Sequence, residues 1–496
     1  MPKSAYTSRY FLKMVGLSGA GLIMTHTLDS AEAREKQLPN IIYIMADDLG
    51  YGDVSCYNPD SKIPTPHIDA LTNAGMRFTD AHSPATVCTP THYGVLTGRY
   101  CWRTWLKRDV LEGDGTPLIE PERLTIASLL KQHGYRSACI GKWHLGLGLA
   151  FLKGKQPLQN THWKTGYWRH IDFTKPFTDG PKELGFDYFF DTPACPTDDC
   201  LWCYVENDRV IGVPQSRDDR MEIPGWRHEE VDTTFTEKSI KFIEDHCRDK
   251  HDKLFFLYLA LSVPHAPWLP PEFVKGKSKV GPRGDQVVLA DWCVQQIRET
   301  IDRLKISDNT LVIFTSDNGP RIGANGHKSA GKLRGYKSHI WEGGHREPFI
   351  ACWPGKIEPG TVSSEPIELT DMIATVAAIV GHDLPPNADE DSYNILPTLL
   401  GKNNKPVRNA LVHHSCFGTF SIRRGKWKLI LGTKDSGGWV EPRDKAPEES
   451  FPGQLYDIVE DPYETKDLWN EYPKVVQKLI ALLDEYRNSG RSRPLR

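Results

Sequence analysis

Residues 41–48 read Ile41-Ile42-Tyr43-Ile44-Met45-Ala46-Asp47-Asp48. Consecutive apolar residues are typical of a strand buried on both faces, and here two acids follow the run directly. Three further apolar runs of strand length also end in polar residues: residues 137–140 before Lys142 and His144, residues 254–261 before His265, and residues 311–315 before Asp317 and Asn318. The pattern predicts four strands that carry chemical groups at their carboxyl ends.

Segments with helical character lie between these runs, at residues 66–74, 124–133, 231–246 and 285–304. Strands that alternate with helices predict an α/β fold with a large, mixed but mostly parallel sheet flanked by helices. Ligands of such sheets bind beyond the carboxyl ends of the strands. We therefore expect the four polar clusters to converge at one edge of the sheet, although they are far apart in the sequence.

Two of the clusters suit a metal ion. Asp47, Asp48, Asp317 and Asn318 offer only oxygen ligands, which bind Ca²⁺ or Mg²⁺ better than Zn²⁺. An acid after a strand can instead cap a helix or a turn. Two such pairs at one sheet edge favour the metal site.

The other two clusters, with a later lysine, bring positive charge and transferable protons. They contribute Lys142, His144, His265 and Lys337. A metal ion and lysines can neutralise the nonbridging oxygens of a tetrahedral anionic ester, and a histidine can protonate the leaving oxygen. A lone histidine at a strand end is more often structural, but this combination predicts an ester hydrolase.

Cys88 lies two residues before Pro90, and a helix-like run follows at residues 91–96. Proline is favoured in the first turn of a helix, so Cys88 is expected just before a helix N-terminus. That position stabilises negative charge and lowers the pKa of a thiol. The residues alone leave three possibilities open: a thiolate nucleophile, a structural cysteine or a disulfide partner.

The run at residues 88–99 resembles the signature of the type I, formylglycine-dependent sulfatases, C-x-P-x-R followed by T-G-R. Further motifs of that family match along nearly the whole mature chain: Asn40 to Asp48, Gly141-Lys142-Trp143-His144-Leu145-Gly146, Pro264-His265-Ala266-Pro267, Ser316-Asp317-Asn318-Gly319, Leu333-Arg334-Gly335-Tyr336-Lys337, Trp341-Glu342-Gly343-Gly344, Leu455-Tyr456-Asp457 and Asp461-Pro462-Tyr463-Glu464. On these motifs the chain is identified as an arylsulfatase-like member of the family, within the alkaline phosphatase superfamily. The resemblance implies an alkaline-phosphatase-like fold and hydrolysis of sulfate esters.

The resemblance also implies the cofactors. One Ca²⁺ per chain would be bound by Asp47, Asp48, Asp317 and Asn318, with residue 88 as a further ligand. A modifying enzyme would convert Cys88 to formylglycine (3-oxoalanine), and the geminal diol of that residue would attack sulfur.

The remaining matched residues would act on the diol and the substrate. Lys142 and His144 would contact the diol, and His144 would take up the proton of the second hydroxyl. Lys142, His265 and Lys337 would bind the sulfate, and His265 and Lys337 would assist the leaving alcohol. Lys328 and Lys332 are near enough in sequence to belong to the same pocket.

His92 stands where the family has an arginine. The resemblance implies that the arginine supports the formylglycine and the metal-site carboxylates, and that it belongs to the signal read by the modifying enzyme. Histidine is shorter and largely neutral near neutral pH, although its charged form at lower pH would restore part of the arginine's role. Two alternatives to a fully active sulfatase stay open: a weakly active or inactive homologue, and a phosphodiester or phosphonate monoester hydrolase of the same superfamily.

Residues 1–33 read as an export signal. A basic region with Lys3, Arg9 and Lys13 precedes an apolar run at residues 14–24, and a small-x-small cleavage pattern follows at residues 31–33. A surface helix is the alternative interpretation. We expect export to the periplasm or the extracellular space, and no later segment is long and apolar enough for stable membrane association.

The chain of 496 residues predicts one large and one small domain. The catalytic domain is expected at residues 37–381 and a C-terminal α+β subdomain at residues 388–496. The subdomain would hold a small antiparallel sheet from residues 410–413, 420–423 and 426–431, a helix at residues 473–486 and a frayed end from residue 489.

Composition limits the partners. The net charge of −3 gives no general field for collecting nucleic acid, so an anionic substrate has to be held by local cations. Eleven cysteines in an exported chain suggest disulfides, with Cys195, Cys200 and Cys203 able to pair locally. The oligomeric state is not indicated.

The substrate is expected to be a small-molecule or glycan sulfate ester, with a sulfated carbohydrate preferred. Aromatic residues gather at residues 162–170 and 200–204, including Trp163, Tyr167, Trp168 and Trp202. Aromatic faces stack against sugar rings, although they also serve to pack loops.

Overall fold

A computed structural model describes residues 38–155, 167–195, 201–218, 220–249, 253–403, 405–432, 435–439 and 452–495. The described residues from Asn40 onward form one compact unit. The export signal expected at residues 1–33 lies outside the described residues. No described helix is long and apolar enough to cross a membrane.

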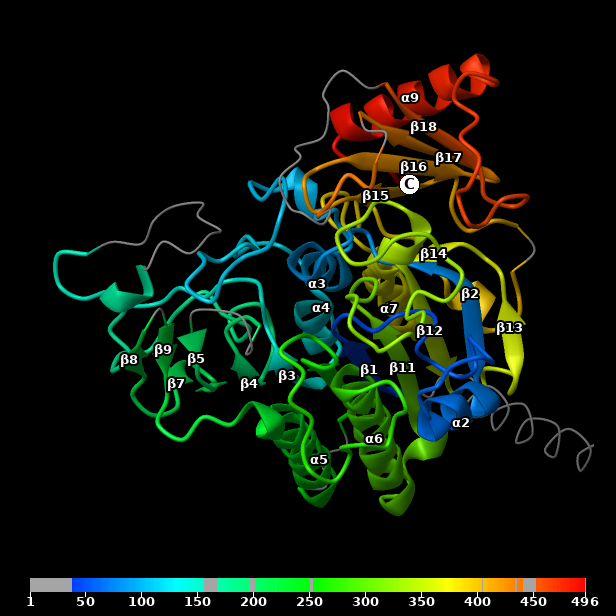
Figure 1. The fold of residues 1–496 in the computed structure, drawn as a ribbon. Coiled ribbons are helices and arrows are strands. Elements are labelled where there is room, and N and C mark those ends of the chain that lie inside the picture. Colours follow the sequence, from blue (N-terminus) through cyan, green and yellow to red (C-terminus); the bar gives the residue numbers. More distant parts are fainter. Residues whose placement is uncertain are drawn as a thin grey trace, which may run out of the picture. The chain divides into compact units, whose positions relative to one another are not determined.

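The described residues form one eleven-stranded sheet, with the order β13-β2-β12-β11-β1-β10-β3-β4-β6-β7 and with β14 beside β2 (Figure 1). Its strands are β1 (Asn40–Ala46), β2 (Met76–His82), β3 (Arg136–Lys142), β4 (Tyr188–Thr192), β6 (Val205–Glu206), β7 (Arg209–Val210), β10 (Phe255–Ala260), β11 (Thr310–Ser316), β12 (Arg346–Cys352), β13 (Thr361–Ser363) and β14 (Ile367–Glu368). The central strands β11, β1, β10, β3 and β4 run parallel, whereas β12 is antiparallel to both β11 and β2. The predicted mixed, mostly parallel sheet is confirmed.

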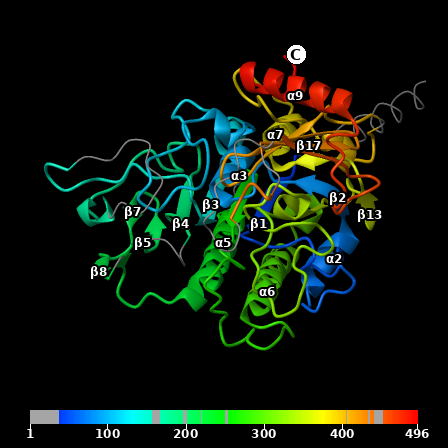
Figure 2. The same ribbon diagram turned by 45° about the horizontal axis from the view of Figure 1, so that its top comes forward.

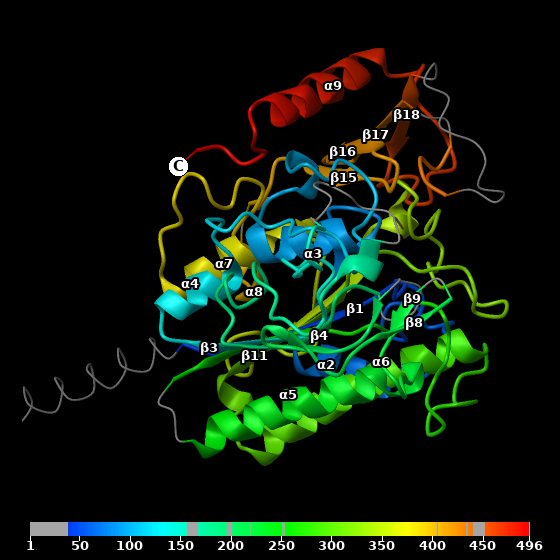
Figure 3. The same ribbon diagram turned by 90° about the vertical axis from the view of Figure 1, so that its left-hand side faces the viewer.

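Helices cover both faces of this sheet. They are α2 (Pro66–Ala74), α3 (Cys88–Thr97), α4 (Ile126–Gln132), α5 (Val231–Arg248), α6 (Pro282–Arg303), α7 (Met372–Val380) and the short α8 (Leu396–Leu399). Figure 3 shows α2, α5 and α6 on one face and α3, α4 and α7 on the other. Because both faces are covered, every residue of β1 and β11 is buried, which explains their continuous apolar sequence.

A second sheet forms the C-terminal part of the same compact unit. It is antiparallel, in the order β15 (Leu411–His414), β16 (Phe420–Arg424), β17 (Trp427–Leu431) and β18 (Gly453–Asp457). Helix α9 (Pro473–Asn488) packs on it (Figures 1 and 2). Three strands and the helix were expected from the sequence, and β18 was missed.

The small sheet shares a hydrophobic core with the large part of the molecule. Tyr100 and Trp102, which follow α3, pack with Val412 of β15 and Leu483 of α9. Residues 489–495 are not frayed as expected, because the Ser492 backbone N–H donates to Asp391 and its carbonyl accepts from Tyr393. The boundary expected near residue 381 thus falls within one compact unit, and the division into two domains stays a prediction.

A separate three-stranded sheet is formed by β5 (Leu201–Trp202), β9 (Arg220–Glu222) and β8 (Gln215–Arg217), in that order. Short 3-10 helices occur at Cys101–Arg103, Tyr167–His170, His228–Glu230, Ser307–Asn309, Glu342–Gly344 and Leu369–Asp371. None of these was expected from the sequence, because such short elements carry little periodicity.

Candidate active site

The four predicted strand-end clusters do converge. In the register of the sheet, Ala46 of β1 pairs with Ser316 of β11, so Asp47 and Asp317 leave the sheet side by side. On the other flank of β1, Ala260 of β10 pairs with Gly141 of β3, which aligns the segments that lead to His265 and Lys142. Parallel pairing of four neighbouring strands is therefore what gathers these residues.

The acidic pairs are tied together by hydrogen bonds. The Asp48 backbone N–H donates to Asp317 Oδ1 at 3.1 Å, and Asn318 Nδ2 donates to Asp48 Oδ1 at 2.7 Å. Asp48 adopts a left-handed backbone conformation with φ of 64°, which is costly for a non-glycine residue and turns the chain sharply at the strand end. The turn places the Asp48 side chain next to Asn318 and Lys337.

Four oxygen atoms of this cluster are buried and have no hydrogen-bond partner in the described part of the chain: Asp47 Oδ1, Asp48 Oδ2, Asp317 Oδ2 and Asn318 Oδ1. A buried oxygen without a partner is unfavourable by about 1–3 kcal/mol. One oxygen from each predicted metal ligand is left in this way. The donor set therefore fits a hard divalent cation.

Two lysines balance part of the negative charge. Lys142 Nζ lies 2.6 Å from Asp47 Oδ2, and Lys337 Nζ lies 2.7 Å from Asp48 Oδ1, all of them buried. Burial alone would raise the pKa of Asp48, but Lys337 and His265 bring it down to about 2. Burial raises the pKa of Asp317, and the Asp47 carboxylate raises it further. The cluster therefore holds more negative charge than its lysines offset, which again favours a cation.

Cys88 is the first residue of α3, one position later than the expected place just before the helix. Its Sγ lies within 4.8 Å of a carboxylate oxygen of Asp47 and of Asp317. Burial would raise the thiol pKa, but Cys195, Lys142 and His144 together hold it well below its usual value. The helix N-terminus acts in the same direction. Residue 88 thus sits where a nucleophile would be stabilised as an anion.

Two histidines face the same space. His144 Nε2 donates to the Leu111 carbonyl at 2.6 Å, which leaves Nδ1 as the acceptor nitrogen of the neutral ring, and Nδ1 is buried without a partner among the described residues. His265 Nδ1 donates to the Ala266 carbonyl at 2.7 Å, and its Nε2 lies 3.7 Å from Asp48 Oδ2. Both rings are thereby held in defined orientations.

Cys195 belongs to this site and was not predicted there. Its Sγ lies 3.6 Å from His265 Nε2 and within 4.8 Å of ligand atoms of Cys88 and His144. Cys195 is a free thiol, so its expected local disulfide is wrong; Cys200 lies outside the described residues. The signal that could have found it is its place three residues after β4, the strand next to β3 in the sheet.

His92 is buried behind the nucleophile. Its Nδ1 lies 3.1 Å from Tyr258 Oη on β10, and its Nε2 lies 3.8 Å from Asp317 Oδ2. Burial holds the pKa of His92 well below its usual value, and Lys142 and His144 lower it further. The lowered pKa disfavours the charged ring, and the expectation that a charged His92 at lower pH restores part of the arginine's role stays a prediction.

Lys328 and Lys332 do not join the site. Both are exposed and line a separate surface pocket with Tyr336 and Tyr463. Of the expected aromatic platforms, Trp168 is buried and Trp202 lies beneath Arg220, so these two side chains pack within the protein. Trp163 and the Tyr167 side chain lie outside the described residues.

Two further motifs, those that contain Glu342 and Glu464, meet in a different place. Glu342, of the Trp-Glu-Gly-Gly run, and Glu464 both pair with buried Lys428 of β17, and the Glu342 backbone N–H donates to Glu464. These residues join the small sheet to the large one and do not touch the nucleophile.

The comparisons with known proteins agree with this geometry. A family model described as Sulfatase matches residues 39–382. The chain is 33% identical to an N-acetylgalactosamine-6-O-sulfatase of Bacteroides thetaiotaomicron, over 92% of this chain and 94% of that protein. It is also 33% identical to human arylsulfatase A, over 90% of this chain and 87% of that protein.

Solved structures show the same architecture. One from Bacteroides thetaiotaomicron, described under the metabolism of multiple glycosaminoglycans, superposes with a TM-score of 0.80 at 33% identity and covers 91% of this chain and 100% of that one. A sulfatase from Pseudoalteromonas gives a TM-score of 0.72 at 25% identity, with 94% and 93% of the two chains covered.

Proposed function

The chain belongs to the sulfatase family of sulfuric ester hydrolases, and from this premise we propose that it cleaves sulfate esters of a sulfated glycan, with formylglycine at residue 88 and one bound Ca²⁺. The observation that carries the proposal is the set of four buried oxygens without partners, placed beside Cys88 at the first residue of α3. A nucleophile, a cation site and two lysines around one point are what a sulfate ester requires.

Asp47, Asp48, Asp317 and Asn318 would hold the Ca²⁺, each through the oxygen that has no other partner. The ion, when bound, would neutralise charge on the sulfate oxygens. Calcium is proposed over magnesium because it accepts several carboxylate and amide oxygens in flexible geometry, whereas magnesium usually keeps several waters.

Residue 88 is the unmodified cysteine in this structure, and its Sγ stands in for the reacting oxygen of formylglycine. Formylglycine would supply a hydrated aldehyde whose hydroxyl attacks sulfur. Lys142, which stays charged beside Asp47, would hold the nucleophilic group and a sulfate oxygen.

The histidines would divide the proton transfers between them. His144 Nδ1 is the acceptor nitrogen, so it would take up a proton from the hydroxyl that does not attack. His265 Nε2 faces Asp48 and, when protonated, would give its proton to the leaving alcohol, while Lys337 holds the sulfate. Cys195 contacts His265 and would help to orient it.

The proposed substrate class is a glycan that contains a sulfated amino sugar. The relative named N-acetylgalactosamine-6-O-sulfatase, which matches over 92% of this chain, supports that class. We propose that the chain is exported to the periplasm or beyond and meets a formylglycine-modifying enzyme during maturation.

The deciding experiment combines mass and activity. The protein is made in a host that contains a modifying enzyme, and the mass of the tryptic peptide at residues 78–99 is measured. The same sample is assayed for sulfate release from a panel of sulfated sugars and from an aryl sulfate. It is also assayed for alcohol release from matched phosphate monoesters and diesters.

Formylglycine at residue 88 with preferred turnover of a sulfated sugar supports the proposal. An unmodified thiol with no sulfate release would contradict it, and so would faster turnover of the phosphate diester. A Cys88→Ala variant, which has no residue to modify, is the matched control for background hydrolysis.

A further inference from the structure

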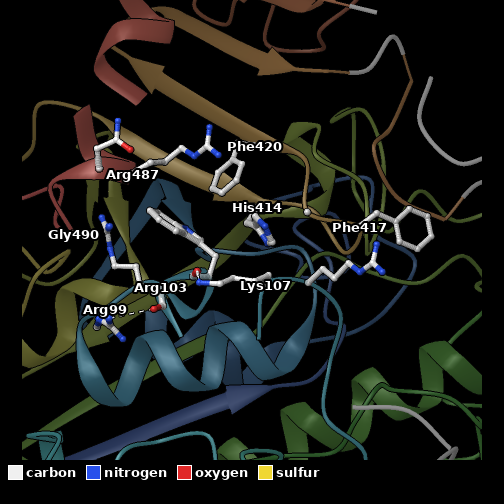
Figure 4. A pocket seen from close by; sticks show the side chains of 12 residues that line it. Arg99, Arg103, Lys107, His414, Phe417, Phe420, Arg487 and Gly490 are labelled. Carbon is white, nitrogen blue, oxygen red and sulfur yellow. Dashed lines mark hydrogen bonds between the residues drawn. The ribbon is translucent and has the colours of Figure 1, made fainter. Parts of the chain in front are cut away.

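A basic pocket lies between the end of α3 and the small C-terminal sheet, apart from the proposed active site. Its volume is about 610 Å³, and it is lined by Arg99, Trp102, Arg103, Lys107, Arg108, His414, Phe417, Gly418, Phe420, Arg487, Asn488 and Gly490. Figure 4 shows Arg99, Arg103 and Lys107 on one side, with Phe420 and Arg487 on the other. The lining contains five arginine or lysine side chains and no acid.

Two of these cations are already neutralised. Arg99 lies 3.4 Å from carboxylate oxygens of both Glu120 and Glu390, and Arg103 makes a two-pronged contact with Asp391. They form the fixed wall of the pocket and are not the groups that would attract a ligand.

The other three cations are available. Lys107 and Arg108 are exposed, and Arg108 has no hydrogen-bond or ion-pair partner among the described residues. The Lys107 ammonium donates to the Trp102 carbonyl only. Arg487 is 44% exposed and has a single long contact of 3.5 Å with Asp484. Positive charge without a partner in a concave site attracts anions.

Aromatic rings pack against the cations that line the pocket. Phe420 lies under the Arg487 guanidinium, 4.9 Å from the ring centroid, and Trp102 packs edge-on against Phe420. His414 forms part of the floor, and burial together with Arg487 and Lys107 lowers its pKa to about 3, so the floor itself is neutral. The rings therefore hold the guanidinium groups in place, and the groups that suit a ligand are the cations, which bind anionic oxygens.

Two chain segments lead from this pocket to the proposed active site. The segment that carries Lys107 and Arg108 continues to Leu111, whose carbonyl accepts from His144. The segment that carries Phe417 contains Cys416, whose backbone N–H donates to the carbonyl of Ser338, the residue after Lys337. Both segments therefore connect the lining of the pocket with residues that contact the proposed site.

The separation between them sets the size of a shared ligand. Helix α3 starts at Cys88 and ends at Thr97, and Arg99 follows it. Ten helical residues span about 15 Å. A ligand that extends from residue 88 to the wall of the pocket at Arg99 must therefore be an oligomer, because one sugar ring is too short.

We propose that this pocket binds an anionic sugar unit of a sulfated oligosaccharide, through Lys107, Arg108 and Arg487, while a distant unit of the same chain lies at residue 88. The proposal rests on the proposed function for the idea that the ligand is the substrate. The available cations of the pocket support the binding of an anionic oligosaccharide independently of that function.

The first test measures binding without turnover. All proteins carry Cys88→Ala, and the probe is a sulfated, uronate-containing tetrasaccharide, with inorganic sulfate as a second probe. The pocket variant adds Arg108→Gln and Arg487→Gln. The matched control adds Lys474→Gln and Lys478→Gln, which remove two exposed cations from the same helix region outside the pocket and give the same net charge.

Titration calorimetry is expected to show tetrasaccharide binding weakened about fivefold in the pocket variant, from the loss of two solvent-exposed charge contacts, and changed less than about twofold in the control. Equal affinities in the two variants would overturn the proposal. Inorganic sulfate that binds as tightly as the tetrasaccharide would also overturn it, because the pocket would then be a simple ion site.

The second test uses active protein with Cys88 intact. The ratio of kcat/KM for the tetrasaccharide to kcat/KM for an aryl sulfate is expected to fall about fivefold in the pocket variant, through KM. If both substrates are turned over and the ratio is the same in the pocket variant as in the parent protein, the role of the pocket is rejected and the proposed function stands. Absence of all sulfate release would reject the proposed function, while the calorimetry still decides on the pocket.

Discussion

His92 Nδ1 and Tyr258 Oη lie 3.1 Å apart, behind the Asp317 carboxylate. Burial raises the pKa of Tyr258 well above its usual value, so the phenol keeps its proton and can donate it to Nδ1. The remaining N–H of His92 then points toward Asp317 Oδ2. The pair occupies the place of the family's arginine and directs one neutral donor at a proposed metal ligand.

Removal of the tyrosine hydroxyl tests this pair. Tyr258→Phe leaves a buried ring nitrogen without a partner and is expected to lower the free energy of unfolding by about 1–3 kcal/mol. Because His92 loses its orientation toward Asp317, kcat is expected to fall while KM changes little. Denaturant unfolding and steady-state kinetics measure the two effects.

Tyr43→Phe is the matched control for that variant. Tyr43 is also buried and its ring stacks beside that of Tyr258, but its hydroxyl has no hydrogen-bond partner among the described residues. Its removal is expected to leave stability unchanged or slightly higher. A loss as large as that of Tyr258→Phe would show that the hydrogen bond to His92 contributes nothing specific.

Restoration of the family's arginine is expected to harm this protein. His92 is 1% exposed, and Tyr258 fills the adjacent space. His92→Arg should overpack the site, at a cost of about 1–3 kcal/mol in stability, and should lower sulfate release. His92→Ala/Tyr258→Phe, which removes both members of the pair without overpacking, separates crowding from the loss of the donor.

A sharp rise in sulfate release by His92→Arg would reverse this view and mark His92 as a lesion in the site. The mass of the peptide at residues 78–99 has to be measured in each variant, because a change in the extent of modification would alter activity without any change in the chemistry.

Calcium is expected to stabilise the fold. An ion that binds only the folded state adds about 2.7 kcal/mol at a concentration one hundred times its Kd. Thermal melting with calcium and with a chelator should therefore differ for the natural protein. Asp317→Asn is expected to abolish most of the difference in melting temperature. Asp308→Asn, which changes an exposed acid nearby in the sequence, should leave the difference unchanged.

Magnesium that shifts the melting temperature as much as calcium at equal concentration would contradict the choice of metal. No shift with either ion would contradict the assignment of the four oxygens to a metal site. The extent of modification of Cys88 has to be measured in the same sample, because residue 88 is expected to be a further ligand of the ion.

Stability is expected to fall as the pH drops below about 6.5. His82, His345 and His413 form a buried cluster, with the Nδ1 atoms of His82 and His345 3.0 Å apart and the rings of His345 and His413 stacked at 3.8 Å. Burial lowers the pKa of all three below the usual value. The groups around them are mixed in charge: Asp80, Glu342, Glu464, Arg346, Arg423 and Lys428.

Because the unfolded chain binds protons near pH 6.5 and the folded cluster does not, protonation favours unfolding. The stabilisation is fully present above pH 6.5 and is lost below it, by up to about 1.4 kcal/mol per pH unit for each histidine. Urea unfolding between pH 7.5 and 5 measures the slope. His413→Gln should reduce the slope; a slope equal to that of the natural protein would contradict the role of the cluster.

The sequence by itself predicted four central strands of the large sheet, four of the helices that cover it, and the polar residues that follow those strands, but not Cys195. Continuous apolar runs predicted β1, β3, β10 and β11, because a strand covered on both faces has no polar side. The convergence of Asp47, Lys142, His265 and Asp317 followed from the parallel order of those strands. Local pattern was sufficient there because each group directly follows a strand.

Only the tertiary structure decided the features that depend on contacts between distant segments. Cys195 contacts His265, which is 70 positions away in the sequence, and Tyr258 forms a hydrogen bond with His92, which is 166 positions away. The basic pocket is lined by residues from the end of α3 and from the small sheet. No periodicity encodes such neighbours, since each arises when separate elements pack. The sequence thus predicted the chemistry of the site, and packing determined how an arginine's place is filled and where a second anion-binding surface lies.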